Sequence, residues 1–217
     1  MRITHLGHAC LLVEAGGQRI LVDPGAFSPG FVDLTGLDAI LVTHQHADHV
    51  DLPRLPALLE INPKARVYAE PQAAAVMEEA GIGAEHTVAG QALTFGPVQV
   101  TPVGHRHALI NEALPRVGNL GVVLRAKGEP SLFHPGDAYD GEPGQIDILA
   151  LPLSAPWAAS RDTIAFAQRI SPRLCVPIHD GLLNAIGRQL YLSHVKSFGP
   201  EGMQVRDLSG GAACDFS

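Results

Sequence analysis

Three histidines and two aspartates lie within ten residues, in the segment VTHQHADHVD at positions 42–51. Imidazole nitrogens and carboxylate oxygens together suit Zn²⁺, and Mn²⁺ and Fe²⁺ accept the same ligands. His44 and His46 are two residues apart, so in extended chain their side chains point the same way and can bind one ion. Asp48 and His49 lie in the turn that follows and face another direction, where they can serve a second ion. The segment therefore predicts a site for divalent metal ions.

Other candidate ligands follow apolar strand patterns elsewhere in the chain. Asp137 follows LFHPG, His179 follows LCVP, and His105 and His107 follow VQVTPVG. Open α/β sheets place their ligand clefts at the carboxyl ends of strands. Four separate segments could therefore bring imidazoles and carboxylates to one edge of the sheets.

Strand patterns alternate with single helices along the whole chain. Strands are expected at 2–6, 9–15, 19–25, 38–44, 65–70, 119–126, 131–137, 147–153 and 173–181, with shorter ones between 86 and 104. Helices are expected from about Leu52, with a distortion at Pro56, and at 71–81, 160–171 and 182–195, the third with Ser160 or Asp162 as its N-cap. Sheets inside and helices outside give an α/β fold, an αββα sandwich. No composition break marks a linker, so residues 1–217 are expected to form a single domain.

Composition narrows the class of protein. The chain has 217 residues, 46% of them apolar, and a formal charge of −7 without a basic run, which argues against nucleic-acid binding. Its apolar stretches are too short to span a bilayer, and the N-terminus lacks the apolar region of a signal peptide. Three widely spaced cysteines indicate reduced thiols. We expect a cytoplasmic protein with a small-molecule substrate and no membrane partner; its oligomeric state is open.

The motif THQHADH at positions 43–49 resembles the H-x-H-x-D-H signature of the metallo-β-lactamase superfamily. The segments LVDPG, GHRHA, HPGDA and VPIHDG fall in the order typical of that family, and the likeness runs from GHACLLVE to PIHDG. It looks closest to the stand-alone metal-dependent hydrolases similar to the ascorbate-phosphate lactonase branch. The resemblance implies the four-layer αββα fold and a site for two divalent ions, Zn²⁺ in the first place and Mn²⁺ or Fe²⁺ as alternatives.

The resemblance also implies a role for each candidate ligand. His44, His46 and a histidine of GHRHA would hold one ion, Asp48, His49 and His179 would hold the other, and Asp137 would bridge the two. Similar sequences carry the third histidine in a G-x-x-H-A pattern, which favours His107. His105 stays an alternative, because residues two apart in an extended chain point to the same side and His105 could face the metals as well as His107.

Further polar and aromatic residues are expected behind the ligands or in the pocket wall. Asp23 could accept the second N–H of a metal-bound imidazole, or it could be a simple turn residue. His134, Tyr139, Trp157 and the unused histidine of GHRHA are the other residues assigned to these places. His8 could reach the cleft, although a structural histidine is favoured there, and His5, His86 and His194 are expected to be unrelated to the metals.

This site predicts hydrolysis. A water held between two divalent ions loses its proton near neutral pH and could attack a small ester, lactone or phosphodiester, with Asp48 orienting it and taking its proton. Tyr139, His134 or metal-bound water could protonate the leaving group. LPLSAP is not a G-x-S-x-G elbow, so a serine hydrolase has no support. Two alternatives stay open: an iron-dependent redox protein on the same fold, and a metal-binding protein without turnover.

Overall fold

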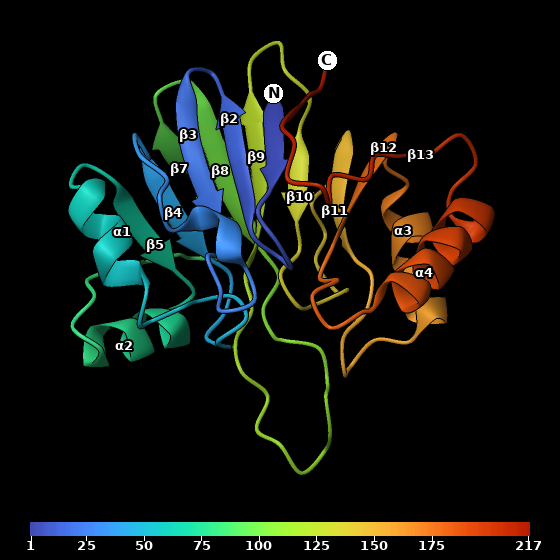
Figure 1. Cartoon of the computed structure of the whole chain (residues 1–217), viewed down its shortest axis with the longest axis horizontal. Coiled ribbons are helices and arrows are strands. Elements are labelled where there is room, and N and C mark those ends of the chain that lie inside the picture. Colours follow the sequence, from blue (N-terminus) through green and yellow to red (C-terminus); the bar gives the residue numbers. More distant parts are fainter.

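Two seven-stranded sheets stand face to face at the centre of the computed structural model, which describes residues 1–217 (Figure 1). The first sheet, ordered β14-β1-β2-β3-β4-β5-β6, contains β1 (Arg2–His5), β2 (Leu11–Ala15), β3 (Gln18–Val22), β4 (Ala39–Val42), β5 (Arg66–Ala69), β6 (Glu85–His86) and β14 (Cys214–Asp215). The second, ordered β13-β12-β11-β10-β9-β8-β7, contains β7 (Leu93–Phe95), β8 (Val98–Val103), β9 (Gly121–Ala126), β10 (Leu132–His134), β11 (Ile148–Pro152), β12 (Leu174–Ile178) and β13 (Gln204–Val205).

Helices cover the outer face of each sheet (Figure 1). The helices α1 (Leu55–Ile61) and α2 (Pro71–Glu79) lie on the first sheet, and α3 (Ser160–Ile170) and α4 (Ala185–Phe198) lie on the second. A short 3-10 helix, η1 (Pro29–Phe31), lies between β3 and β4 in the chain. None of the helices has the length and apolar composition needed to cross a membrane.

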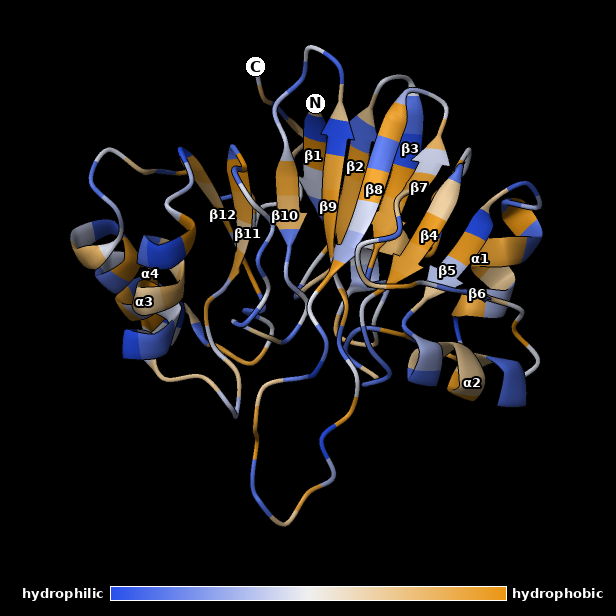
Figure 2. Ribbon diagram, turned by 180° about the vertical axis from the view of Figure 1, so that it is seen from behind, coloured by the Kyte–Doolittle hydropathy of each residue, from blue (hydrophilic) through white to orange (hydrophobic).

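Three separate apolar cores explain the four layers. In β2, Leu11 and Val13 face the core between the sheets, whereas Leu12 faces the core under α1 and α2. The third core packs β10 and β11 against α3 and α4, with Phe133 and Phe166 in contact. Strands buried on both faces are apolar at nearly every position, and Figure 2 shows them predominantly in the hydrophobic colour. The predicted αββα sandwich is confirmed.

The starts of α1 and α4 and the N-cap of α3 differ from the sequence-based expectation. The helix α4 begins at Ala185 instead of Leu182, with Asn184 as its N-cap. The first helix begins at Leu55 instead of Leu52, which puts Pro56 in its first turn. Proline is tolerated there because those N–H groups have no partner within the helix, so the expected distortion is absent. In α3 the residue before the helix is Ala159, and Asp162 accepts a hydrogen bond from its N–H (3.4 Å). The prediction of Ser160 or Asp162 as the N-cap was wrong.

Strand direction gathers many loops at one edge of both sheets. In the first sheet β1, β3 and β4 run the same way, because β2 is antiparallel to β1 and β3 and β3 is parallel to β4. In the second sheet β8, β10, β11 and β12 also share a direction. The long connection from β8 to β9 projects beyond this edge, and both termini lie at the opposite end (Figure 1). The carboxyl ends of seven strands therefore frame one region.

Candidate metal centre

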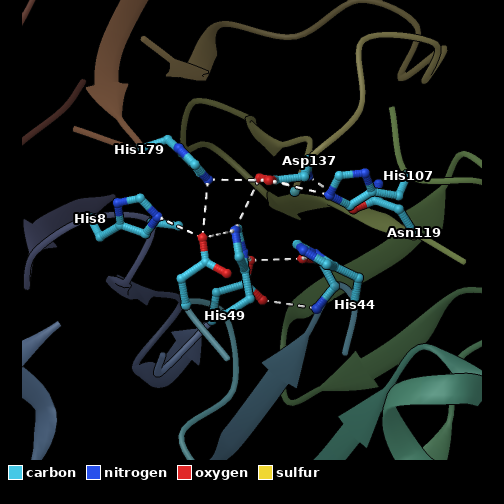
Figure 3. Close-up of polar contacts among 12 residues, drawn as sticks. His8, His44, His49, His107, Asn119, Asp137 and His179 are labelled. Atoms are coloured by element: carbon cyan, nitrogen blue, oxygen red, sulfur yellow. Dashed lines mark hydrogen bonds and ion pairs between the residues drawn. The ribbon is translucent and has the colours of Figure 1, made fainter. Parts of the chain in front are cut away.

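The predicted ligands come together at this edge, in two groups. The side chains of His44, His46 and His107 offer nitrogen atoms within 4.8 Å of one another. Asp48, His49 and His179 form a second such group, which also contains His8. Asp137 lies between the two groups, because its carboxylate is 3.0 Å from His49 Nε2, 3.1 Å from His179 Nε2 and 3.4 Å from His107 Nε2 (Figure 3). Segments from both sheets contribute to each group.

Four of these histidines use Nδ1 for a hydrogen bond that points away from the centre. His49 Nδ1 donates to Asp23 Oδ2 (2.7 Å), and His44 Nδ1 donates to the Thr43 hydroxyl (3.1 Å). Backbone carbonyls take the other two donors: Ala108 O accepts from His107 Nδ1 (2.6 Å), and Ser154 O accepts from His179 Nδ1 (2.7 Å). These partners assign the proton to Nδ1 in the neutral rings. Each Nε2 then carries a lone pair directed at the centre, as a metal ligand requires.

The inward atoms are buried and lack hydrogen-bond partners. They are His44 Nε2, His49 Nε2, His107 Nε2, His179 Nε2 and Asp137 Oδ1. Buried polar atoms are nearly always paired, so five orphans in one place call for a ligand. Because nitrogen and carboxylate oxygen donors suit Zn²⁺, Mn²⁺ and Fe²⁺, the residues fit divalent metal ions.

Asp137 is held by partners outside the ligand groups. Its backbone N–H donates to Asn119 Oδ1 (2.9 Å), and the Asn119 amide donates in turn to Pro135 O (2.9 Å). The Trp157 indole N–H donates to Asp137 Oδ2 (2.9 Å), so Trp157 supports this carboxylate. Oδ1 is left directed at the centre without a hydrogen bond.

Asp23 supports the centre from behind. Its Oδ1 accepts from the Thr43 backbone N–H (2.8 Å), and its Oδ2 accepts from the Thr43 hydroxyl (2.7 Å) as well as from His49. Asp23, His8 and His179 also have positive φ angles of 51°, 49° and 57°. Such conformations are uncommon outside glycine and cluster at functional sites. Asp23 therefore takes the predicted carboxylate position.

Neighbouring carboxylates raise the pKa of two candidate ligands, His179 and His49, despite their burial. Burial opposes protonation of His179, but the Asp137 carboxylate prevails and raises the pKa of His179 to about 9. Asp137 and Asp23 likewise outweigh burial and raise the pKa of His49. Burial would raise the pKa of Asp48, yet the neighbouring His179 and His8 imidazoles hold that pKa well below its usual range. Burial instead lowers the pKa of His44 and His46, so cation binding has protons to displace from His49 and His179.

We expect the metal-free protein to lose stability as the pH rises from about 7 to about 10. The pKa of His179 is raised from about 6.5 in the unfolded chain to about 9 in the folded protein. Its contribution to the free energy of unfolding is therefore complete below about pH 6.5 and is lost as the pH rises through about 9. Thermal unfolding in a chelating buffer measures this slope. The His179→Gln variant should flatten it; an equal slope in that variant would contradict the assignment.

His105 lies away from the ligand groups, whereas Tyr139 and His134 lie behind them, His134 with its Nδ1 3.8 Å from Asp23 Oδ2. His105 is exposed and belongs to neither ligand group, whereas His107 is 2% exposed. The Tyr139 hydroxyl is engaged by Pro152 O and Thr163 (2.9 and 2.8 Å), and its ring packs edge-on against Trp157. His134 is fully buried, with Nε2 on Ala9 O (2.8 Å) and Nδ1 accepting from Gly136 N–H (3.2 Å). Neither Tyr139 nor His134 is placed to protonate a leaving group.

Asn119 was missed by the sequence analysis, and for His8 a structural role was favoured over a place in the cleft. The His8 Nε2 lies 3.1 Å from Asp48 Oδ2, at the cleft. Like the other ligands, His8 follows the carboxyl end of a strand, since β1 ends at His5 and runs in the same direction as β3 and β4. Asn119 lies just before β9, a strand that begins at the same edge. An asparagine before a strand carries no comparable signal.

Comparison with known proteins agrees with this geometry. The family model described as "Beta-lactamase superfamily domain" matches residues 2–179. The chain belongs to this family. Protein Rv0786c of Mycobacterium tuberculosis is 41% identical over 206 residues, which cover 94% of this chain and 96% of the relative. UPF0173 metal-dependent hydrolase MK1542 of Methanopyrus kandleri is 32% identical, with 83% and 84% covered.

Solved structures share the fold. The metallo-β-lactamase fold protein YhfI from Bacillus subtilis superposes with a TM-score of 0.76 at 16% identity, over 98% of both chains. Together, the family match, the relatives and this structure confirm the predicted superfamily, its fold and the class of stand-alone metal-dependent hydrolase.

Proposed function

We propose that this β-lactamase-superfamily protein binds two divalent ions and hydrolyses a small ester, lactone or phosphodiester. One ion would lie on His44, His46 and His107, the other on Asp48, His49 and His179, with Asp137 bridging. The observation that carries the proposal is the arrangement of donor atoms in two groups, each within 4.8 Å, with Asp137 in reach of both. Zn²⁺ suits this set best, and Mn²⁺ or Fe²⁺ would also be accepted.

Two bound ions would act as Lewis acids and make a water nucleophilic near neutral pH. Asp48 is the carboxylate suited to orient that water. Its side chain is 21% exposed, whereas Asp137 is 4% exposed, so Asp48 is the one that solvent and substrate can reach. Its low pKa keeps it ionised and able to accept a hydrogen bond from the attacking water.

Two aromatic side chains lie beside histidines of the centre. Phe27 is 46% exposed, and its ring lies 5.2 Å from that of His8. The half-buried ring of Trp157 lies 6.0 Å from that of His107. Aromatic neighbours favour a substrate with an uncharged, apolar portion, that is, a carboxylic ester or lactone over a phosphodiester.

A panel of model substrates tests the proposal. Protein freed of metal and reloaded with Zn²⁺ or Mn²⁺ is offered nitrophenyl butyrate, an alkyl-substituted lactone and bis(nitrophenyl) phosphate. We expect metal-dependent turnover, fastest on the ester or the lactone, because the aromatic side chains of Phe27 and Trp157 favour uncharged groups. Elemental analysis of each sample gives the ions per chain.

The chelated protein is the control, and activity should return on reloading. Turnover that persists without metal would contradict the proposal. A fully loaded protein that is inactive on the whole panel would favour a metal-binding protein without turnover. Iron retained after purification together with redox activity would favour the redox alternative.

A further inference from the structure

His8 differs from the other histidines of the centre in the direction of its hydrogen bonds. It follows β1, is 1% exposed, and its ring lies 3.9 Å from that of His179. The Gly181 backbone N–H donates to His8 Nδ1 (3.1 Å). Because a ring nitrogen that accepts a hydrogen bond bears a lone pair, these contacts assign the proton of neutral His8 to Nε2.

The protonated Nε2 faces a carboxylate. It lies 3.1 Å from Asp48 Oδ2, the same oxygen that is 3.5 Å from His179 Nε2 (Figure 3). The four histidines described above present lone pairs to the centre, but His8 presents a hydrogen-bond donor. A nitrogen that carries a proton cannot ligate a metal, so proximity alone does not make His8 a ligand.

The surrounding chain fixes His8 in this orientation. Its carbonyl accepts hydrogen bonds from the His179 backbone N–H (2.7 Å) and from His5 Nε2 (2.7 Å). Its φ angle of 49° is left-handed, a conformation that asparagine and histidine adopt more readily than most residues. A Cβ atom added at Gly181 would lie 2.9 Å from His8 Nδ1, so this glycine makes room for the ring. The fold thus holds a rigid donor beside Asp48.

We propose that His8 is a positioning residue that fixes the Asp48 carboxylate for the ion held by Asp48, His49 and His179. This inference rests on the proposed two-ion function and adds a division of labour between the two ions. Asp48 lies in the turn after His46, and its side chain is partly exposed, so the hydrogen bond from His8 is what fixes its orientation most directly. The ion on His44, His46 and His107 has no contact with His8 and should be indifferent to its loss.

Two substitutions separate the donor from the shape of the residue. In His8→Asn the side-chain oxygen can replace Nδ1 as the acceptor for Gly181, and asparagine tolerates the left-handed φ, but the chain is too short to reach Asp48. In His8→Gln the amide nitrogen reaches the place of Nε2 and can still donate to Asp48. Asparagine is therefore the test, and glutamine is the conservative rescue.

Metal-free protein is titrated with Co²⁺, whose visible absorption reports each ion and its ligands, with no substrate present. His8→Asn should weaken one of the two binding steps by about 10–100-fold, the cost of losing a partner behind a ligand. The other step should keep its Kd, and His8→Gln should restore most of the lost affinity. Thermal unfolding of the metal-free variants checks the fold.

The titrations test the role of His8 and the two-ion function separately. Unchanged Kd values in His8→Asn, equal weakening of both steps, or a glutamine variant no better than asparagine would each overturn the role of His8. A wild-type protein that binds one ion per chain would instead refute the two-ion function. In that case His8→Asn must still weaken the single ion, or the inference fails as well.

Discussion

Replacement of Asp137 by alanine is expected to abolish the binding of two ions per chain. Asp137 lies between the ligand groups, within 3.4 Å of His49, His107 and His179, so its loss removes a shared ligand and not a peripheral one. Hydrolysis should fall by more than about 100-fold, because loss of a partner merely behind a ligand already costs about 10–100-fold. Elemental analysis and kcat/KM on the preferred model substrate measure both effects.

Asp140 provides the matched control for this substitution. It lies three residues further along the same loop and is exposed, so Asp140→Ala removes a carboxylate without touching either ligand group. Asp137→Asn keeps the shape of the side chain and can still accept from Trp157, which separates the missing charge from a cavity. If Asp137→Ala retains two ions per chain, the bridging role is wrong.

Replacement of His107 by alanine should remove the ion proposed for His44, His46 and His107. The ring of His107 is buried, and its Nε2 is one of the unpartnered atoms of the centre. Activity should again fall by more than about 100-fold, since a lost ligand must cost more than a lost partner behind it. Metal content should drop to one ion per chain.

The matched control lies two residues away. His105→Ala should leave kcat/KM within about a factor of two, as is typical of exposed positions without special contacts. Equal losses in the two variants would mean that both histidines take part. A larger loss in His105→Ala would move the ligand to that residue.

Much of the candidate centre was visible in the sequence because ligand clefts of α/β sheets lie at the carboxyl ends of strands. His44, Asp137 and His179 each follow an apolar strand, and the strands of both sheets deliver their carboxyl ends to one edge. Strand patterns and their alternation with helices also predicted the four layers, because strands covered on both faces are nearly all apolar. The helix start at Leu55 and the short strands β13 and β14 were beyond such patterns.

The choice between His105 and His107 shows where pattern reasoning stops. The chain is extended between the two residues, because Arg106 pairs with Gly118 in an antiparallel bridge. His105 is nevertheless exposed and His107 buried, so their surroundings, and not their spacing, separate them. Only the resemblance to the superfamily favoured His107.

The suggestion that His134 or Tyr139 protonates the leaving group rested on their closeness to Asp137 in sequence. His134 lies behind Asp23 (Nδ1 to Oδ2 3.8 Å), and the Tyr139 hydroxyl is engaged by Pro152 O and Thr163. Which way a side chain turns at the end of a strand depends on packing by distant segments. No local pattern records that packing.

The distribution of ligands over the two sheets has a mechanical consequence. His44, His46, Asp48 and His49 follow the first sheet's β4, whereas His107, Asp137 and His179 follow strands of the second. Each proposed cation would therefore bind ligands from both sheets, at the end where the backbone hydrogen bonds from Leu120 N–H to Thr43 O and from His179 N–H to His8 O already connect them. Metal binding would add further links between the N-terminal and C-terminal halves of the chain and should raise the stability of the whole sandwich.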